Sequence, residues 1–380
     1  MDKEVDAVIV GAGVAGSGMA CALANNGWEV VVFDKSAYPR HKACGEFLSP
    51  ESRSVLRAFE LDKEVRTLRP AEIVGVRIHS ERGVSLEIPL PGSAWGVSRH
   101  ALDARLQQSA EERGALVRTG TPVTAITEDG GRYRVEYRSG REAVSLRSRI
   151  VIGAWGRRPY HARDLRQTSA NPGKEACFGI KSHYAGTDRL PIVDLYFFRG
   201  GYIGISPIEG DRINVAAILS PSVFRQFGGP SAIERLLDEA ARRVPSLRRR
   251  LDGATPVPGT DAASAPFSAR RKPVAWKEFP CIGDAAAVIP PFCGDGMAMA
   301  LRSAELCAPL ADSYLRKQRS LAEWRESYSR SIKRDFTGPL RWGGLLEFAL
   351  THSAVAPWLL RLGAIAPKMA ERLVRATRLR

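Results

Sequence analysis

The first 34 residues combine two apolar runs and a glycine-rich turn in an order that predicts strand, helix and strand. Residues 7–10 and 30–33 are short runs of mostly β-branched apolar residues, which is typical of strands buried on both faces of a parallel sheet. Residues 14–26 between them have a helical composition, and Gly27 follows at a position suited to a helix C-terminus. The pattern therefore predicts a βαβ unit at the start of the chain.

The turn between the first strand and the helix carries a phosphate-binding pattern. Gly11, Gly13 and Gly16 have G-x-G-x-x-G spacing, which allows a tight turn, close approach of the backbone to a pyrophosphate, and close packing of helix on strand. The helix N-terminus offers free N–H groups to an anion, and Asp34 ends the second strand, where it can bind a ribose diol. The unit predicts a dinucleotide, and by itself it leaves open whether this is FAD or NAD(P).

Later segments predict further strands and helices. Alternating apolar residues over 73–88 predict a β-hairpin, residues 98–113 predict a helix with Ser98 as N-cap, and several strands follow up to residue 152, two of them at 143–146 and 150–152. The loop over 35–50 is expected to be irregular, and residues 177–219 contain four strand patterns separated by glycine-rich turns, which predicts an antiparallel sheet.

The C-terminal third is predicted to be mainly helical. A long helix is expected after Gly294, with a kink or interruption at Pro309. From residue 321 onward the apolar residues recur at three- and four-residue spacing, with turns expected at Gly343-Gly344 and Pro357.

The predicted fold class is α/β: a doubly wound, Rossmann-like nucleotide-binding domain with an inserted antiparallel β-sheet substrate domain and a helical C-terminal segment. A chain of 380 residues is long enough for more than one core. We expect the discontinuous nucleotide-binding domain at residues 1–70, 98–170 and 273–330, the substrate domain at 71–97 and 171–272, and the C-terminal segment at 331–380.

The composition bears on the cellular location of the protein, on disulfide bonds and on metal sites. No run of about 18 apolar residues occurs, and charged residues near Met1 lead directly into the first strand, so we expect neither a spanning helix nor a signal peptide but a cytoplasmic protein. The six cysteines form no C-x-x-C pair and are expected to be reduced thiols. The histidines have no metal-ligand spacing, which predicts no metal site; they are His41, His79, His100, His161, His183 and His352.

A formal net charge of +15 raises the question of an anionic partner. The basic residues are spread along the chain without an interleaved aromatic pattern, so no nucleic-acid partner is expected. They are densest near the C-terminus, where Lys368, Arg372 and Arg375 lie beside apolar residues. This segment is either a peripheral contact with an anionic membrane or, as we favour, a set of helices packed on the body of the protein.

Three segments together resemble a flavoprotein superfamily that contains p-hydroxybenzoate hydroxylase-like monooxygenases, flavin-dependent halogenases and geranylgeranyl reductases. They are the glycine turn with Asp34, the helix start V-S-R-H-A-L-D at 97–103, and G-D-A-A at 283–286 with G-D-G at 294–296. The resemblance implies that the dinucleotide is FAD, that Arg99 reaches the cofactor, and that Asp284 holds its ribityl chain.

Within this superfamily, no single family accounts for all of the motifs. The stretch K-A-C-G-E-F-L-S at 42–49 is similar to R-C-G-E-x-L-S of geranylgeranyl reductases, and the strand from Gly200 to Pro207 resembles their G-G-Y-x-W-x-x-P segment, with Gly204 in place of the aromatic residue. Hydroxylases usually have histidine where Ala287 stands and aspartate where Trp155 stands. The W-x-W-x-I-P signature of the halogenases does not occur in the sequence.

These observations lead to a function hypothesis. The leading hypothesis is an NAD(P)H-driven flavin monooxygenase that hydroxylates or epoxidises an apolar aromatic, polyketide or isoprenoid small molecule. The alternative is a reductase of carbon–carbon double bonds, of the geranylgeranyl type. A third alternative, from another class, is an FAD-containing basic adaptor for membrane or RNA. Cys44 and Glu46 are the candidate catalytic residues. The candidate FAD-binding residues are Gly11, Gly13, Ala15, Gly16, Asp34, Lys35, Arg99, Gly283, Asp284, Pro291, Gly294, Gly296 and Met297.

Overall fold

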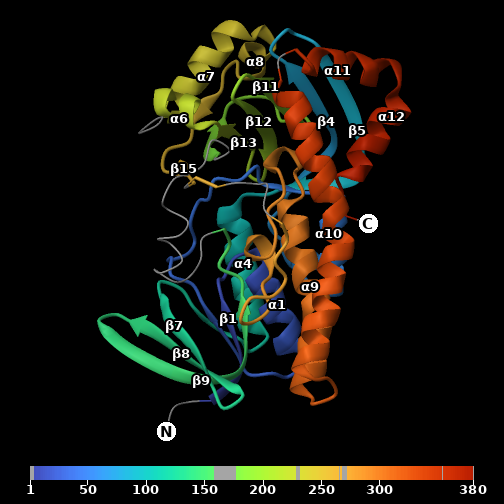
Figure 1. Cartoon of the computed structure of the whole chain (residues 1–380). Helices are drawn as coiled ribbons and strands as arrows, with labels where there is room; N and C mark the ends of the chain where they lie inside the picture. Colours follow the sequence, from blue (N-terminus) through green and yellow to red (C-terminus); the bar gives the residue numbers. More distant parts are fainter. Residues whose placement is uncertain are drawn as a thin grey trace.

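The computed structural model describes residues 4–157, 177–227, 232–264, 266–267, 272–352 and 354–379. Two β-sheets form its centre, one in the lower half and one in the upper half of Figure 1, and a long helix, α10 (Leu321–Thr351), runs beside both. The mixture of parallel strands, crossover helices and a second sheet confirms the predicted α/β class.

The first sheet contains the predicted βαβ unit. Its strand order is β6-β2-β1-β9-β8-β7, and β1 pairs in parallel with both β2 and β9. Helix α1 (Val14–Asn25) connects β1 to β2 and is buried along most of its length, as the apolar sequence requires. The strands are β1 (Glu4–Val10), β2 (Val30–Phe33), β6 (Leu116–Arg118), β7 (Val123–Asp129), β8 (Arg132–Ser139) and β9 (Glu142–Gly153).

The second sheet has the order β14-β10-β13-β12-β11-β4-β5-β3, with β15 paired to β10. Most neighbours are antiparallel, as predicted, but β11 pairs in parallel with β4, so the sheet is mixed. The strands are β3 (Phe47–Leu48), β4 (Ala71–Ser80), β5 (Ser85–Gly96), β10 (Phe178–Ala185), β11 (Ile192–Phe198), β12 (Gly201–Ile208), β13 (Arg212–Leu219), β14 (Thr255–Pro256) and β15 (Ala262–Ala263).

Helices pack against parts of both sheets and form the C-terminal end of the chain. The remaining helical segments are α2 (Pro50–Ala58), α3 (Asp62–Arg66), α4 (Arg99–Glu112), α6 (Pro221–Phe227), α7 (Ala232–Arg243), α8 (Pro245–Arg250), η1 (Gly283–Ala285), η2 (Pro291–Cys293), α9 (Gly296–Leu315), α10 (Leu321–Thr351), α11 (Ala356–Ile365) and α12 (Pro367–Ala376). In the described residues no single helix is long and apolar enough to cross a membrane; α10 and α11 reach that threshold only as a pair, bent by 112°.

Two of the predicted breaks between elements are wrong. The segments at 143–146 and 150–152 are one strand, β9, because its first half pairs with β8 and its second half with β1. The loop over 35–50 contains the short strand β3, which pairs with Trp95 and Gly96 at the end of β5. Local composition did not indicate either feature, since both depend on strands distant in sequence.

The C-terminal helices are not interrupted at Pro309, and the turn predicted at Gly343-Gly344 is wrong. Helix α9 continues through Pro309 to Leu315, and α10 continues through Gly343-Gly344 to Thr351. Gly343 allows close packing instead of a turn: a Cβ atom there would lie 3.0 Å from Cys293 Sγ and 3.3 Å from Pro290 Cδ. Gly344 faces open space. The first glycine therefore lets α10 approach the segment that precedes α9.

This difference between neighbouring glycines can be measured. Replacing Gly344 with alanine should raise the free energy of unfolding by about 0.5–1 kcal/mol, because alanine loses less backbone entropy in a helix. Gly343→Leu should lower it by about 1–3 kcal/mol, because its side chain would overlap Cys293 and Pro290. Denaturant titration of both variants measures the two changes, and changes of equal sign and size would contradict the close approach.

Candidate functional site

A cavity of about 1280 Å³ lies between the two sheets. Its polar part is formed by the turn after β1, the loop after β2 and the segment from Gly283 to Met297. Its apolar part is formed by side chains of the second sheet and of α10 to α12. These apolar residues include Val76, Ile78, Leu86, Ile88, Leu90, Val193, Leu195, Leu346, Leu350, Leu359, Leu360, Leu373 and Val374.

The glycine turn after β1 is closed on two sides and open toward the cavity. A Cβ atom on Gly11 would lie 2.2 Å from Ala154 O, and one on Gly16 would lie 1.8 Å from Gly11 O, so neither position has room for a side chain. At Gly13 the nearest atoms would be Arg99 Nη2 and Lys42 Nζ, both 3.8 Å away. The turn therefore presents backbone to a space flanked by two cations.

Asp34 is held rigidly at the end of β2. Its Oδ2 accepts hydrogen bonds from Ala12 N at 3.0 Å and from the Tyr38 hydroxyl at 3.1 Å, and its Oδ1 accepts one from Ser36 N at 2.9 Å. Asp34 and the neighbouring Lys35 both line the cavity. The carboxylate is thus fixed beside the glycine turn, where a ribose would be bound.

Asp103 holds the two cations beside Gly13. Arg99 donates to it through Nε at 3.0 Å and Nη2 at 2.9 Å, and Lys42 Nζ lies 2.6 Å from its Oδ2. Burial disfavours the charge on Arg99, but Asp103 outweighs this and raises the pKa of the guanidinium. Burial lowers the pKa of Lys42 to about 8, although Asp103 opposes the shift. Lys42 and Asp103 were not predicted; the i,i+4 spacing of Arg99 and Asp103 was the available signal.

The segment that leads into α9 forms the opposite wall. Asp284 has 38% of its side-chain surface open, and its nearest cation is Arg157 at 3.6 Å. Enclosure in the cavity raises the pKa of the Asp284 carboxyl, and Arg157 opposes the shift. The other predicted cofactor residues of this segment also line the cavity; they are Gly283, Pro291, Gly294, Gly296 and Met297, and Ala15 lines it from the start of α1.

The two predicted catalytic residues differ in burial: Cys44 is partly buried and Glu46 is fully buried. Cys44 lines the cavity, and its carbonyl oxygen accepts a hydrogen bond from Asn214 Nδ2 at 2.9 Å. Glu46 is fully buried, and its Oε1 accepts a hydrogen bond from Arg99 N at 3.0 Å. Its Oε2 lies 2.6 Å from His183 Nε2, and its Oε1 lies 3.4 Å from Lys181 Nζ. Glu46 is therefore an anion surrounded by donors.

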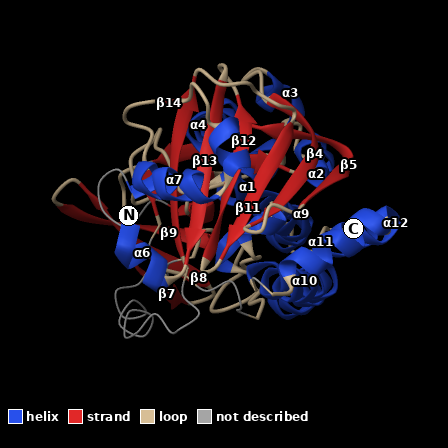
Figure 2. Ribbon diagram, turned by 90° about the horizontal axis from the view of Figure 1, so that it is seen from above, coloured by secondary structure: helices blue, strands red, loops and turns tan. Residues whose placement is uncertain are grey.

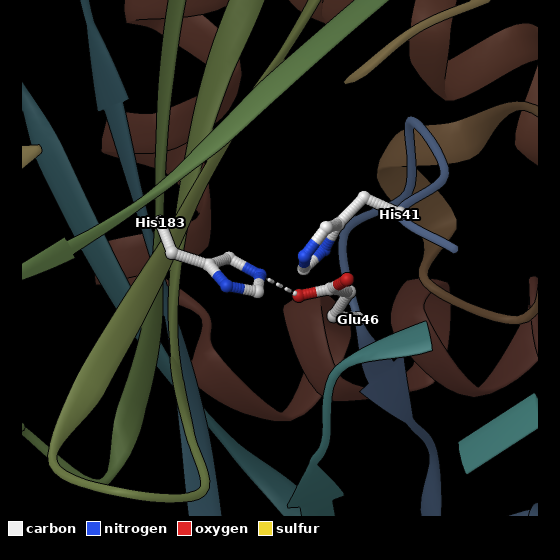
Figure 3. A group of neighbouring side chains, drawn as sticks. All are labelled: His41, Glu46 and His183. Carbon is white, nitrogen blue, oxygen red and sulfur yellow. Dashed lines mark hydrogen bonds and ion pairs between the residues drawn. The ribbon is translucent and has the colours of Figure 1, made fainter. Parts of the chain in front are cut away.

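Figure 3 shows how His41 and His183 approach the Glu46 carboxylate from two sides. Ligand atoms of these three residues all lie within 4.8 Å of one another, a grouping that could hold a metal ion. However, Lys181 Nζ already lies among them, 2.8 Å from His183 Nε2 and 3.1 Å from His41 Nδ1. The lysine supplies the positive charge that a metal would otherwise provide, so we interpret the group as a lysine-centred ion cluster.

Electrostatics in this cluster favour an ionised carboxylate. Burial alone would raise the pKa of Glu46, but His183 and Lys181 outweigh it, so the pKa lies below its ordinary value. Burial lowers the pKa of Lys181, against the pull of Glu46. Burial, together with Lys181 and His183, lowers the pKa of His41 to about 4, so this histidine is neutral near pH 7. His41 lines the cavity and is in contact with the buried lysine.

This cluster is hard to predict from the sequence. Lys181 and His183 stand two residues apart in β10, so they share one face of the strand, and a polar pair in an apolar strand was the available signal. Their contact with the loop at His41 depends on the tertiary fold. Among the other histidines, His100 stacks on His41, and His79 is buried against Tyr196. His161 lies outside the described residues.

The C-terminus of the chain also reaches the cavity wall. Arg378 Nη1 donates to Asp295 Oδ1 at 2.9 Å and lies 3.3 Å from Glu51 Oε2. Asp295 is the N-cap residue of α9 and is fully buried, which raises the pKa of its carboxyl to about 7, while Arg378 opposes the shift. This contact fastens the end of α12 to the start of α9.

Comparison with known proteins identifies the family. The sequence model of the family described as "FAD binding domain" matches residues 4–330, most of the chain. The chain belongs to this FAD-binding family. It is similar to a menaquinone reductase of Mycobacterium tuberculosis, with 29% identity over 96% of this chain and 90% of the relative. It is also similar to digeranylgeranylglycerophospholipid reductase 2 of Methanopyrus kandleri, with 25% identity over 93% of this chain and 86% of the relative.

Solved structures support the fold of this FAD-binding protein. The structure of a flavin-dependent brominase superposes with a TM-score of 0.79 at 20% identity, covering 99% of this chain and 93% of the brominase. At this identity the likeness concerns the fold alone. Together with the family match it identifies the protein as an FAD-dependent oxidoreductase of the flavoprotein superfamily suggested by the sequence motifs.

The residues around the cavity fit FAD. The space beside Gly13 lies between Arg99 and Lys42, which suits a pyrophosphate. Asp34 is positioned for the adenosine ribose. Asp284 has an open carboxylate at the other wall, available to hydroxyl groups of the ribityl chain. The assignments of individual residues remain predictions that binding measurements can test.

Arg99 provides the sharpest test of the FAD site. Arg99→Met should raise the dissociation constant of FAD about ten- to a hundredfold, since a charge-assisted hydrogen bond contributes about 1.5–3 kcal/mol. Fluorescence titration of the apoprotein with FAD measures this change. The matched control is Arg105→Met on the same helix, because Arg105 pairs with Glu64 and Glu112 outside the cavity. Equal affinities of both variants for FAD would contradict the assignment.

Lys181 is expected to stabilise the fold through Glu46. Lys181→Met should lower the free energy of unfolding by about 3–5 kcal/mol, because it removes the cation from a buried carboxylate. Glu46→Gln in the Lys181→Met background should recover part of this loss, which denaturant titration of both single variants and the double variant measures. Strictly additive effects would show that the two residues are not coupled.

Proposed function

We propose that the protein is an FAD-dependent reductase that saturates a carbon–carbon double bond in an isoprenoid chain of a lipid, with NAD(P)H as the electron donor. From the sequence alone the monooxygenase hypothesis led and the reductase was the alternative. Two observations now favour the reductase: two of the relatives are named as reductases, and the cavity is large and has an apolar wall. Menaquinone and digeranylgeranylglycerophospholipids, the compounds named for these two reductases, both carry long unsaturated isoprenoid chains, which supports a substrate of this class.

The apolar part of the cavity is the observation that carries the proposal. A volume of about 1280 Å³ exceeds the roughly 300–1,000 Å³ of a pocket for one small ligand, so FAD and a second long molecule can be accommodated together. The wall beyond the cofactor residues is formed by aliphatic side chains of β4, β5 and β11 on one side and of α10 to α12 on the other. Such a wall suits a flexible hydrocarbon chain.

Saturation of a double bond adds two electrons and two protons, as a hydride on one carbon and a proton on the other. Bound FAD, once reduced by NAD(P)H, supplies the hydride. The protein must supply the proton from the cavity wall. Glu46 also belongs to the cavity wall, but it is unsuited to this because its pKa is depressed and its carboxylate is fully buried among hydrogen-bond donors.

Two groups on the wall are suited to proton transfer. The Cys44 thiol lines the cavity at the loop between the sheets. His41 also lines it, and because its Nδ1 faces the Lys181 ammonium at 3.1 Å, the neutral ring can carry its proton on Nε2. We assign proton donation to Cys44, one of the two residues, Cys44 and Glu46, that the sequence indicated for this role, and we assign His41 to the cavity wall beside it.

Turnover without oxygen tests the proposed reaction. The FAD-loaded protein, reduced by NADPH under strict anaerobiosis, should convert a detergent-dispersed geranylgeranyl lipid into a product heavier by two hydrogen atoms, measured by mass spectrometry. A product heavier by one oxygen atom, formed only in air, would establish the monooxygenase instead. A flavin that no donor reduces would contradict both reactions.

The role of Cys44 is tested in the same assay. Cys44→Ala should lower kcat about a hundredfold or more while FAD affinity is unchanged, because the proton donor is lost and the cofactor contacts remain. Cys44→Ser should retain part of the activity. The matched control is Cys177→Ala, since Cys177 is partly buried and is not part of the cavity wall. Full activity of Cys44→Ala would exclude the thiol as the donor.

A further inference from the structure

The exposed large apolar side chains of the described residues are concentrated on the C-terminal helices. Of twelve such residues, four are scattered over the rest of the chain, and eight lie between positions 342 and 369. The eight form what we call the apolar face; they are Trp342, Leu345, Phe348, Val355, Trp358, Leu362, Ile365 and Met369. Trp358 is 66% exposed and Ile365 is 81% exposed, so no part of the described structure covers them.

The apolar face has helical periodicity. Trp342, Leu345 and Phe348 follow at three-residue spacing on α10, and Trp358, Leu362 and Ile365 follow at four- and three-residue spacing on α11, so each set lies on one side of its helix. Figure 2 shows α11 and α12 at one edge of the molecule, and their inner sides pack against β4 and β5. Three consecutive helices therefore carry exposed apolar side chains that the described part of the fold does not bury.

Cations border this face. Arg341, Arg361, Lys368, Arg372 and Arg375 are all exposed, whereas the acidic residues of the same segment, Glu347 and Glu371, are partly buried. Arg361 lies over the ring of Trp358, with 5.8 Å from Cζ to the ring centroid. Aromatic and aliphatic residues bordered by arginine and lysine are typical of helices that lie in the interface of an anionic bilayer.

We propose that the apolar face docks on the surface of an anionic lipid bilayer. A second copy of the chain is the competing occupant. In a two-fold interface the same patch meets itself, so the exposed cations around the face of one copy would oppose those of the other. An anionic bilayer instead accepts the apolar side chains and attracts the cations, which agrees with the charge around the face.

The same helices form the wall of the cavity. Leu346 and Leu350 line it from α10, and Leu359 and Leu360 line it from α11, next to residues that face outward. Met369 is both part of the cavity wall and 46% exposed, which places it at the rim. An isoprenoid lipid would therefore pass from the bilayer into the cavity between these helices. This passage rests on the proposed function, whereas the docking itself does not.

Vesicle flotation tests the docking. The FAD-loaded protein should float with vesicles of phosphatidylcholine mixed with phosphatidylglycerol, and it should float less with pure phosphatidylcholine or at high salt. Trp358→Asp combined with Ile365→Asp should weaken binding to the mixed vesicles about tenfold or more, because two exposed apolar anchors become charged. Both residues lie outside the cavity wall, so FAD affinity should be unchanged.

Leu321→Asp is the matched control. Leu321 is 40% exposed at the first turn of the same helix, α10, outside the apolar face, and an acidic residue is favourable at a helix N-terminus. This variant should bind the vesicles as the unaltered protein does. Absence of flotation, equal flotation of the double variant and the unaltered protein, or self-association through this face without vesicle binding would each overturn the proposal.

The docking and the proposed reaction can fail separately. If both are right, the double variant should reduce a detergent-dispersed short-chain substrate at the normal rate and lose turnover of the same lipid embedded in vesicles. Flotation that depends on Trp358 and Ile365 in a protein with no reductase activity would refute the reaction and leave the docking standing. Reductase activity without flotation would refute the docking and leave the reaction standing.

Discussion

The buried carboxylate of Glu46 is the contact on which the arrangement of the site depends. It lies in the loop after β2, accepts a hydrogen bond from Arg99 N at the start of α4, and pairs with His183 and Lys181 on β10. One side chain thus connects the dinucleotide-binding sheet, its helix and the second sheet. Because an unpaired buried charge would be costly, this connection fixes the relative position of all three elements.

A second buried carboxylate, that of Glu209, binds the N-terminus of α4. Glu209, between β12 and β13, accepts hydrogen bonds from Ser98 N at 2.7 Å and from Ser98 Oγ at 2.5 Å. Two acidic side chains from distant parts of the chain therefore meet the N-terminus of α4, where the helix dipole favours negative charge. The first turn of that helix also carries Arg99. The cation beside the glycine turn is consequently positioned by contacts with the second sheet, which couples the FAD site to the substrate side of the cavity.

The sequence predicted the parts of the site that are local. Gly11, Gly13 and Asp34 belong to one continuous βαβ unit, and their positions follow from turn geometry and strand order. The ion cluster could not be predicted in this way, because His41 and His183 are separated by most of the first domain and meet only when β10 packs against the loop after β2. Glu46 was recognised as a candidate acid, but its partners, which make it an anion, come from that same packing.

In the fold, too, features that depend on local sequence were predicted, and features that depend on tertiary contacts were not. Strand and helix periodicity predicted most elements correctly, including the N-cap at Ser98, which accepts a hydrogen bond from Ala101 N. The errors occurred where a residue type has two uses. Glycine at position 343 was interpreted as a turn, although it permits close packing against Cys293. Pro309 was expected to kink or interrupt its helix, and α9 continues through it without interruption.

The C-terminal helices connect the surface of the molecule to its interior. Their inner side chains line the cavity, their outer side chains form the apolar face, and Arg378 pairs with Asp295 at the start of α9. Packed helices move as units because interiors are dense and deform little. Any partner that shifts α11 or α12 must therefore also shift the cavity wall or strain the buried pair of Arg378 and Asp295. The apolar character of the cavity and that of the exposed face thus have one structural origin, a helical segment with two apolar sides.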